Sequence, residues 1–312
     1  MARRSGKPRR SGKPSNVRLL SRPSRLVMWG GVAIGLAFFL LFGIVPALAN
    51  IVISLTDYSG LAGASVSFTG LDNYTTLFTT QWPGFVASLG DSLYFVVGVT
   101  VVQNAIALAL AHRLQGTSRT AALLRILAFL PIVLGVTVVG IVWLLLFDPQ
   151  SGPVQSILGH TGFHSAFFGS GSLAMPLTIL VQVWQNLGFT MVVFIGGLKA
   201  IPSEIFEAAA LDGVSGWQRF RRLTWPLMAP VVTVNVTFAV IGSLTTYNLI
   251  YILTDGQFGT NTLGILAFNT AFGNTADLGL GASMSVILLL LAIIVALPLV
   301  AFLQHRERRL LA

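Results

Sequence analysis

Six long apolar stretches constrain this chain of 312 residues more than any other feature of its sequence. A helix needs about 20 apolar residues to cross a hydrocarbon core about 30 Å thick, and each stretch reaches that length. Apolar residues make up 54% of the chain and charged residues only 9%, so most of it suits lipid better than water. We therefore expect an all-α membrane protein whose six transmembrane helices lie near residues 28–52, 92–112, 124–147, 173–198, 230–253 and 281–303.

The N-terminal segment, residues 1–26, differs from the rest of the chain in charge. It holds nine of the 19 basic residues and no acidic residue, whereas the ten basic and ten acidic residues beyond it cancel. A segment rich in Ser, Pro, Gly and Arg cannot bury a core, so we expect a disordered cytoplasmic tail that contacts anionic lipids rather than nucleic acid. Residues 27–312 are expected to form one transmembrane domain. Its first span is longer than the apolar run of a signal peptide, and we expect it to stay uncleaved.

The loop charges predict how the spans are oriented. Basic residues occur in the loops after the second and fourth spans and behind the sixth, while the other three loops carry acidic residues but no Lys or Arg. Cytoplasmic loops of membrane proteins are enriched in Lys and Arg. Both termini are therefore expected in the cytoplasm, together with the loop over 199–228.

Groups that could carry chemistry are scarce in the predicted spans. The chain has no cysteine and its four histidines fall in loops or at span ends, so we expect no metal site, no cofactor and no catalytic centre at membrane depth. Asp91 stands at the start of the second span, where we expect it to cap the helix. The phosphate-binding pattern G-x-x-x-x-G-K-[ST] does not occur, so ATP that drives this chain must be hydrolysed by another subunit.

The loop over 199–228 has the sequence of two short helices joined by a turn. Ser203 is a good N-cap, Glu204 suits a first helical turn, and the alanines after it favour a helix that Gly213 would end. A second helix is expected to start near Ser215. Such a hairpin can dock in a groove of another protein or lie against lipid headgroups, and its composition favours neither alternative.

The same loop carries a motif that resembles a known family. Glu-Ala-Ala-Ala-x-Asp-Gly at 207–213, followed by a proline thirteen residues later, is similar to the EAA loop of binding-protein-dependent ABC importer permeases. Phe-Thr-Gly-Leu-Asp-Asn-Tyr at 68–74 is similar to a segment of the carbohydrate branch, with its maltose and glycerol-phosphate permeases. The resemblance implies that the following residues couple the chain to an ATPase: Glu207, Ala208, Ala209, Asp212, Gly213 and Pro226.

The resemblance also implies a fold, partners and a location. The fold is that of a type I ABC importer permease in the bacterial plasma membrane. The partners are a second related permease, a cytoplasmic dimer of ABC ATPases and an extracytoplasmic solute-binding protein. Two stretches depart from the family pattern, Asp-Gly-Gln-Phe-Gly at 255–259 and the Gly- and Ser-rich loop over 148–172. Both are expected on the outer side, where a solute-binding protein would dock.

Polar residues in the fourth and fifth spans indicate where a solute could pass. Uncharged side chains can hydrogen-bond hydroxyl groups without the cost of a buried charge, which suits a sugar or a polyol. Hydrogen bonding between helices is the alternative role for each of them. The candidates are Gln182, Trp184, Asn186, Thr237, Asn248 and Tyr251.

Two alternative functions compete with an ATP-driven sugar permease. The first is an ABC permease for another solute, such as an amino acid, a peptide or an oxyanion. An oxyanion path would call for cationic residues inside the spans, and none is found there. The second is a self-contained secondary carrier, which would need carboxylates in the spans or a symmetric repeat. Neither feature is visible, so we expect the ATP-driven permease.

Overall fold

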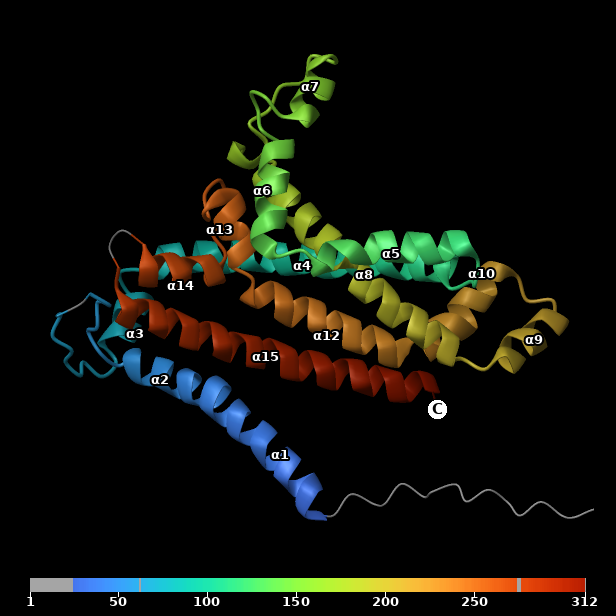
Figure 1. Cartoon of the computed structure of the whole chain (residues 1–312), viewed down its shortest axis with the longest axis horizontal. Coiled ribbons are helices and arrows are strands. Elements are labelled where there is room, and N and C mark those ends of the chain that lie inside the picture. The colour runs from blue at the N-terminus through green and yellow to red at the C-terminus, as the bar shows by residue number, and fades with distance from the viewer. Residues whose placement is uncertain (1–24, 62, 274–275, 312) are drawn as a thin grey trace, which may run out of the picture. The chain divides into compact units, whose positions relative to one another are not determined.

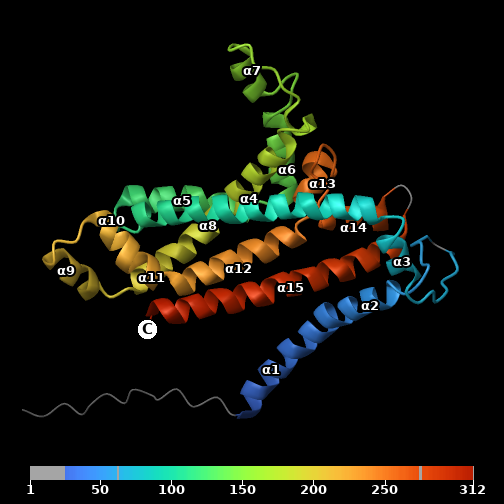
Figure 2. The ribbon, with the colours of Figure 1, turned by 180° about the vertical axis from the view of Figure 1, so that it is seen from behind.

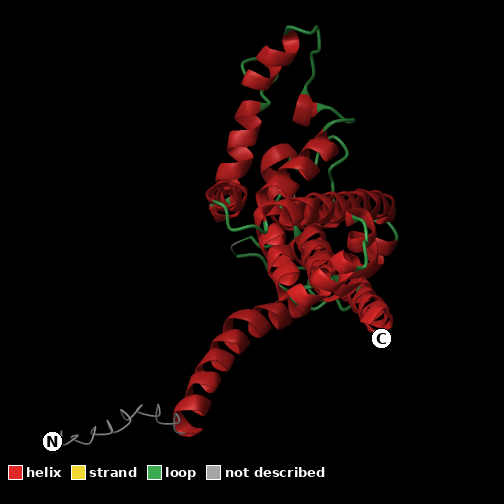
Figure 3. Cartoon of the chain, turned by 90° about the vertical axis from the view of Figure 1, so that its right-hand side faces the viewer, coloured by secondary structure: helices red, strands yellow, loops and turns green. Residues whose placement is uncertain are grey.

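A computed structural model describes residues 25–61, 63–273 and 276–311. Within these ranges the chain forms helices and loops without a β-strand (Figure 3). Four helices are long and apolar enough to cross a membrane, and two bent helix pairs raise the number to six if each pair is one span. The predicted all-α membrane fold is confirmed. The predicted N-terminal tail lies almost entirely outside the described residues.

The chain divides into two compact units, residues 1–49 and 50–312. The first contains α1 (Arg25–Phe39) and a π-helical turn, η1 (Leu40–Ile44), which leads into α2 (Val45–Ile53). Residues 29–53 of this run are apolar enough for one span, and its large apolar side chains are exposed. A helix with this composition is stable only where lipid or another apolar surface covers it.

Four long helices build the second unit. They are α4 (Trp82–Leu114), α8 (Ala174–Ala200), α12 (Ala229–Thr245) and α15 (Leu278–Leu311). Helix α4 packs along α8 and α12, and α15 packs along α12, as Figures 1 and 2 show from opposite sides. The shorter α14 (Leu263–Phe272) lies against α4 and α15.

Helix α4 begins well before the predicted second span because Pro83 fits its first turn. Asp91 therefore lies inside α4, and the prediction that it caps this helix is wrong. Its carboxylate instead accepts a hydrogen bond from the backbone N–H of Asn261 at 3.0 Å. The neighbouring Ser92 hydroxyl accepts one from the N–H of Leu263 at 2.8 Å. The two side chains thus satisfy backbone donors at the start of α14, which pins α14 to α4.

The apolar stretch over 124–147 is not one straight helix. It forms α5 (Arg119–Val133) and α6 (Val136–Leu146), which meet at an angle of 103°. Leu134 and Gly135 adopt extended backbone with ψ of 137° and 139°, three residues after Pro131, which lacks an N–H for the helix ladder. Helix α6 consequently turns away from α5 and packs against α13 (Asn248–Thr254) (Figure 1).

Beyond α6 the chain forms the short helix α7 (Pro153–Gly159) and a 3₁₀ turn, η2 (Phe167–Gly169). Phe168 of this turn is buried with Val139 of α6, Val181 of α8 and Leu249 of α13. A small apolar core therefore holds the segment that leaves the bundle.

The stretch over 230–253 is also broken. Helix α12 ends at Thr245, Thr246 has ψ of 120°, and α13 starts afresh at Asn248. The hydroxyls of Thr245 and Thr246 both contact the carbonyl of Gly242, at 3.3 and 2.8 Å, and such bonds to the preceding turn often bend helices. At its other end α12 forms a bent pair of 69° with the run over 216–227.

The segment at 68–74 is anchored by its polar residues. It leads into α3 (Asp72–Phe78), where the Asn73 amide donates to the carbonyls of Ser54 and Thr56 at 3.0 and 2.8 Å. The Tyr74 hydroxyl lies 2.7 Å from the Ser54 hydroxyl. Asn73 and Tyr74 of this motif therefore form hydrogen bonds with backbone carbonyls and a hydroxyl group just after the end of α2.

Candidate functional site

The loop between α8 and α12 starts with α9 (Ser203–Leu211). The prediction that Ser203 is the N-cap is wrong, because Pro202 holds that position with extended backbone, φ −56° and ψ 137°. Ser203 is the first helical residue, and the cap makes no side-chain hydrogen bond. Glu204 lies in the first turn, where its charge favours the positive end of the helix dipole.

Gly213 ends α9, as predicted from the sequence. Its φ of +68° lies in the left-handed region that glycine adopts without strain. The N–H of Gly213 donates to the carbonyl of Ala210 at 3.2 Å, and the N–H of Val214 donates to that of Ala209 at 3.1 Å. This pair of bonds is a Schellman motif, and it fixes the direction in which the chain leaves the helix.

The second helix starts after Ser215, also as predicted. The Ser215 hydroxyl accepts from the N–H of Gln218, and the Gln218 side chain accepts from the N–H of Ser215, which completes a capping box. The helical run comprises α10 (Gly216–Arg219), the π-helical η3 (Phe220–Thr224) and α11 (Trp225–Leu227). Pro226 lies in α11 directly behind η3, so the regular helical hydrogen bonding is already interrupted where proline lacks an N–H.

Helix α9, the first helix of the loop, is largely exposed. Helix α9 lies beyond the ends of α4, α5 and α8 (Figure 1), and Glu207, Ala208, Asp212 and Gly213 are exposed on it or just behind it. Ala209 is the one buried residue of α9. Leu211 is 90% exposed, although its side chain is large and apolar. The acidic Asp212 follows it.

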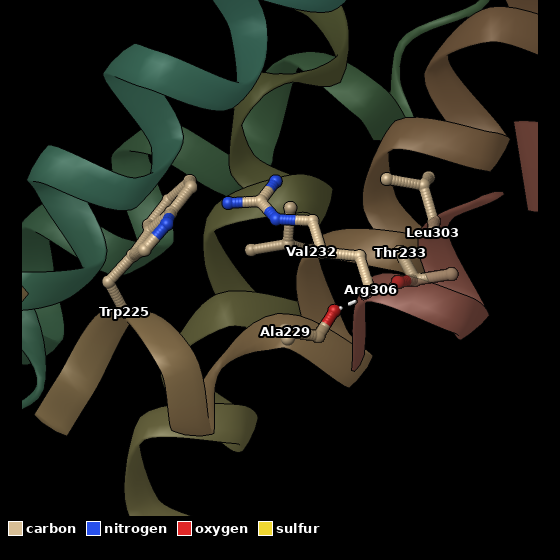
Figure 4. Close-up of a pocket in the computed structure, with 6 residues that line it drawn as sticks. All are labelled: Trp225, Ala229, Val232, Thr233, Leu303 and Arg306. Atoms are coloured by element: carbon tan, nitrogen blue, oxygen red, sulfur yellow. Dashed lines mark hydrogen bonds between the residues drawn. The ribbon is translucent and has the colours of Figure 1, made fainter. Parts of the chain in front are cut away.

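Two cation–π contacts tie this loop to its surroundings. The guanidinium of Arg219 lies 5.9 Å from the ring centre of Phe206, which connects α10 to α9. The guanidinium of Arg306, on α15, lies 5.7 Å from the ring centre of Trp225 on α11. Figure 4 shows the guanidinium of Arg306 facing the ring of Trp225, with Val232 nearby; all three residues line a small cavity. Movement of the loop would therefore reach α15 directly.

A cavity of about 280 Å³ lies among α4, α5, α8 and α12; its lining is mainly apolar but includes five amide or hydroxyl side chains, and we call it the polar cavity after these. Gln182 and Asn186 of α8 line it, and the Asn186 amide donates to the carbonyl of Gln182 at 3.0 Å. Gln103 of α4 lines the same cavity and donates to the hydroxyl of Thr190 at 2.7 Å. Phe189 and other apolar side chains complete the wall. The lining contains no charged residue, so the cavity presents hydrogen-bonding groups at neutral charge.

The other substrate-path candidates lie elsewhere. Trp184 is on another face of α8, where its ring meets Trp143 edge to face at 5.5 Å. The Thr237 hydroxyl donates to a carbonyl of its own helix at 2.7 Å. Asn248 opens α13, and its side chain accepts from the N–H of the next residue at 2.9 Å. Of the six candidates, the structure brings only Gln182 and Asn186 together.

Tyr251 lines a separate, wider cavity of about 530 Å³ between the ends of α6 and α13. Its ring also packs edge to face on Phe268 at 5.1 Å. Asp148 lies at the rim of this cavity and accepts hydrogen bonds from the backbone N–H groups of Ser151 and Gln150 and from the Ser151 hydroxyl. These bonds, from Ser151 first, hold the pKa of Asp148 below its ordinary value.

The sequence reasoning missed Gln103, Thr190 and Ser243, which all line the polar cavity and are less than a tenth exposed. Each is a polar residue inside an apolar stretch, so the rule that selected Gln182 also applies to them. Gln103 lies in the second apolar stretch, whereas the candidates predicted from the sequence all lie in the fourth and fifth.

The fold and these sites define a class of protein. Several apolar helices enclose an uncharged polar cavity, while a structured helical loop leaves the bundle at one end. Among the described residues no group of three or more His, Asp or Glu side chains could hold a metal ion. The chain is a multi-pass membrane protein.

Comparison with known proteins gives the family. Residues 103–310 match the family described as binding-protein-dependent transport system inner membrane component. The chain is 30% identical to the sn-glycerol-3-phosphate transport system permease protein UgpA of Agrobacterium fabrum, over 74% of this chain and 79% of that protein. It is 26% identical to a probable permease of a starch degradation products transport system in Thermoanaerobacterium thermosulfurigenes, over 89% and 94%.

A solved structure shares the fold. A chain of a bacterial alginate ABC transporter, crystallised with an alginate-bound periplasmic protein, superposes with a TM-score of 0.76 at 17% identity, over 91% of this chain and 94% of that one. The chain belongs to the family of inner-membrane permease components of binding-protein-dependent transport systems.

Proposed function

We propose that this chain forms half of the translocation path of an ATP-driven ABC importer for a sugar or a polyol. A second related permease forms the other half, a cytoplasmic ATPase dimer supplies the energy, and an extracytoplasmic binding protein delivers the solute. Both termini lie in the cytoplasm, together with the loop over 203–228. The observation that carries the proposal is α9, an exposed helix whose exit is fixed by the left-handed Gly213.

Helix α9 has the properties of a docking element. It has two turns, acidic residues along it and an almost fully exposed Leu211 at its end, so a groove on another protein could cover it. Its orientation is set by the Schellman motif on one side and by the Arg219–Phe206 contact on the other. A docked α9 would act as a lever, because α10 and α11 lead into α12 and α11 contacts α15.

The polar cavity supports a solute with hydroxyl groups. Its volume of about 280 Å³ lies near the lower end of small-molecule pockets, about 300 to 1,000 Å³. Its amides and hydroxyls can exchange hydrogen bonds with a sugar, and the absence of charge in its lining fits a neutral solute. The starch-product and alginate systems among the relatives and structural neighbours also handle carbohydrates by their names.

Uptake by two variants of the loop, Gly213→Pro and Glu207→Lys, tests the coupling. Gly213→Pro cannot keep φ at +68° and loses the N–H that donates to Ala210, so we expect it to abolish ATP-driven uptake while the chain still inserts into the membrane. Glu207→Lys, which reverses an exposed charge on α9, should have the same effect.

Gly216→Pro is the matched control. Gly216 is the first residue of α10, and Ser215 before it is already extended with ψ of 156°, so proline fits there. We expect near-normal uptake from this variant. Full transport by Gly213→Pro and Glu207→Lys would contradict the coupling role of the loop.

A further inference from the structure

Another cavity, of about 420 Å³, opens where the end of α4 meets α10 and η3. One wall is apolar and consists of Ala105 and Leu108 of α4. The opposite wall is aromatic and consists of Trp217 and Phe220. His112 and Arg113, in the last turn of α4, complete the lining. This cavity is separate from the polar cavity and from the exposed face of α9.

The aromatic wall is ordered but only partly covered. The rings of Trp217 and Phe220 stack with centres 5.7 Å apart, and the edge of Phe220 meets His112 at 6.2 Å. Trp217 nevertheless remains 69% exposed. An indole in this position is typical of the membrane–water interface, where its apolar ring contacts lipid and its N–H stays near water.

The polarity of the cavity changes along α4. Ala105, Leu108 and His112 recur at helical spacing, so they share one face, with the apolar residues toward the middle of the span and the basic ones at its end. His112 and Arg113 are exposed and therefore accessible. The cavity thus offers an apolar slot of lipid depth and a cationic rim at headgroup depth.

We propose that this cavity binds an anionic phospholipid. The phosphate lies at Arg113 and His112, and one acyl chain lies between Leu108 and the Trp217–Phe220 wall. The apolar walls favour a lipid over free phosphate, because a free ion would leave them uncovered. The lipid holds α10 at the membrane surface, while α9 stays free for another protein. The inference rests on the membrane location of α4 and does not depend on the identity of the cargo.

Native mass spectrometry of the purified chain tests this proposal. Dioleoyl phosphatidylglycerol is titrated against dioleoyl phosphatidylcholine, which has the same acyl chains but no net charge. We expect preferential retention of phosphatidylglycerol by the wild type. Arg113→Gln should weaken it about fivefold, the change that corresponds to about 1 kcal/mol per basic residue near an anionic surface. Arg113→Lys should keep most of the preference.

Arg221→Gln is the matched control, because Arg221 is an exposed basic residue that follows Phe220 in η3 but does not line the cavity. It should bind phosphatidylglycerol like the wild type. Equal retention of the two lipids by the wild type, or equal losses in Arg113→Gln and Arg221→Gln, would overturn the proposal. Displacement of phosphatidylglycerol by millimolar inorganic phosphate would also overturn it, since it would assign the rim to a free anion. A Trp217→Ala variant that loses ATPase binding but keeps full lipid binding would assign the aromatic wall to a protein.

Discussion

Gly188 sets the distance between α5 and α8 beside the polar cavity. A Cβ atom at this position would lie 2.2 Å from the carbonyl oxygen of Ala128 and 2.4 Å from the Cα of Phe129. An ordinary contact begins near 3.4 Å, so α5 would have to retreat by about 1.2 Å, the difference between 3.4 and 2.2 Å, because backbone atoms cannot rotate away. Ile132 of α5 lines the cavity together with residues of α8, so this retreat would also reshape the cavity.

The Gly188→Ala variant should therefore be unstable relative to a matched alanine. Gly196→Ala lies on the same helix, where an added Cβ meets no atom within 4 Å. Both variants gain the same helix propensity, about 1 kcal/mol, so their difference isolates the cost of overpacking, about 1 to 3 kcal/mol. Thermal unfolding of the two purified chains in one detergent gives the comparison, with about 2 to 4 °C expected per kcal/mol. A melting temperature of Gly188→Ala equal to or above that of Gly196→Ala would show that Gly188 does not set the distance between α5 and α8.

Three further predictions concern the loop, the rim of the outer cavity and the polar cavity. Gly213→Ala should weaken binding of the ATPase partner about 5- to 30-fold, because a left-handed non-glycine residue costs about 1 to 2 kcal/mol. Gly216→Ala should leave this binding unchanged, since Gly216 has no left-handed backbone and an added Cβ meets no atom. Equal affinities of the two variants, measured by titration in nanodiscs, would contradict this prediction. The ionised carboxylate of Asp148 stabilises its turn at pH values above its ordinary pKa, and this stabilisation is lost as the pH falls through the lowered pKa of the folded chain. Ser151→Ala removes one hydrogen-bond donor to the carboxylate, so the pKa of Asp148 measured by NMR should rise; an unchanged pKa would contradict this prediction. Gln103→Leu should cost about 0.6 kcal/mol of stability, the mean for hydrogen bonds between membrane helices, and raise the KM for uptake; an unchanged KM would remove Gln103 from the solute path.

The sequence predicted the fold class because hydropathy depends only on composition over about 20 residues. It did not predict the directions of the helices. The stretch over 124–147 is uniformly apolar, yet extended backbone at Leu134 and Gly135 turns it by 103°. Pro131 signalled a kink, but the size of the turn depends on the packing of α6 against α13, which is a tertiary contact.

The same limit explains the substrate-path candidates. Thr237, Asn248 and Tyr251 belong to the apolar stretch over 230–253, which the sequence predicts as a single span. The helix is interrupted at Thr246, so α13 is a separate helix from α12. Asn248 and Tyr251 on α13 therefore do not continue the face of α12 that carries Thr237. Gln182 and Asn186 belong to the unbroken α8, and both line the same cavity.

The turn after α9 could be predicted because its chemistry is local. Gly213 accepts a left-handed conformation, and the capping box needs only Ser215 and Gln218. The N-cap of α9 was misplaced by one residue, since Pro202 takes the extended conformation that a capping residue needs. Contacts with other proteins depend on residues outside this chain, so they leave no comparable local pattern in its sequence.

The proposed function requires that this chain transport solute only as part of an ATP-driven complex. The most direct test is purification of the tagged chain from its native membrane in a gentle detergent, identification of every co-purifying protein, and measurement of sugar uptake after reconstitution into liposomes with and without ATP. We expect an ABC ATPase, a second permease and a sugar-loaded binding protein, with uptake that stops when ATP is withheld. Recovery of the chain alone, still transporting solute without ATP, would contradict the account and identify a self-contained carrier.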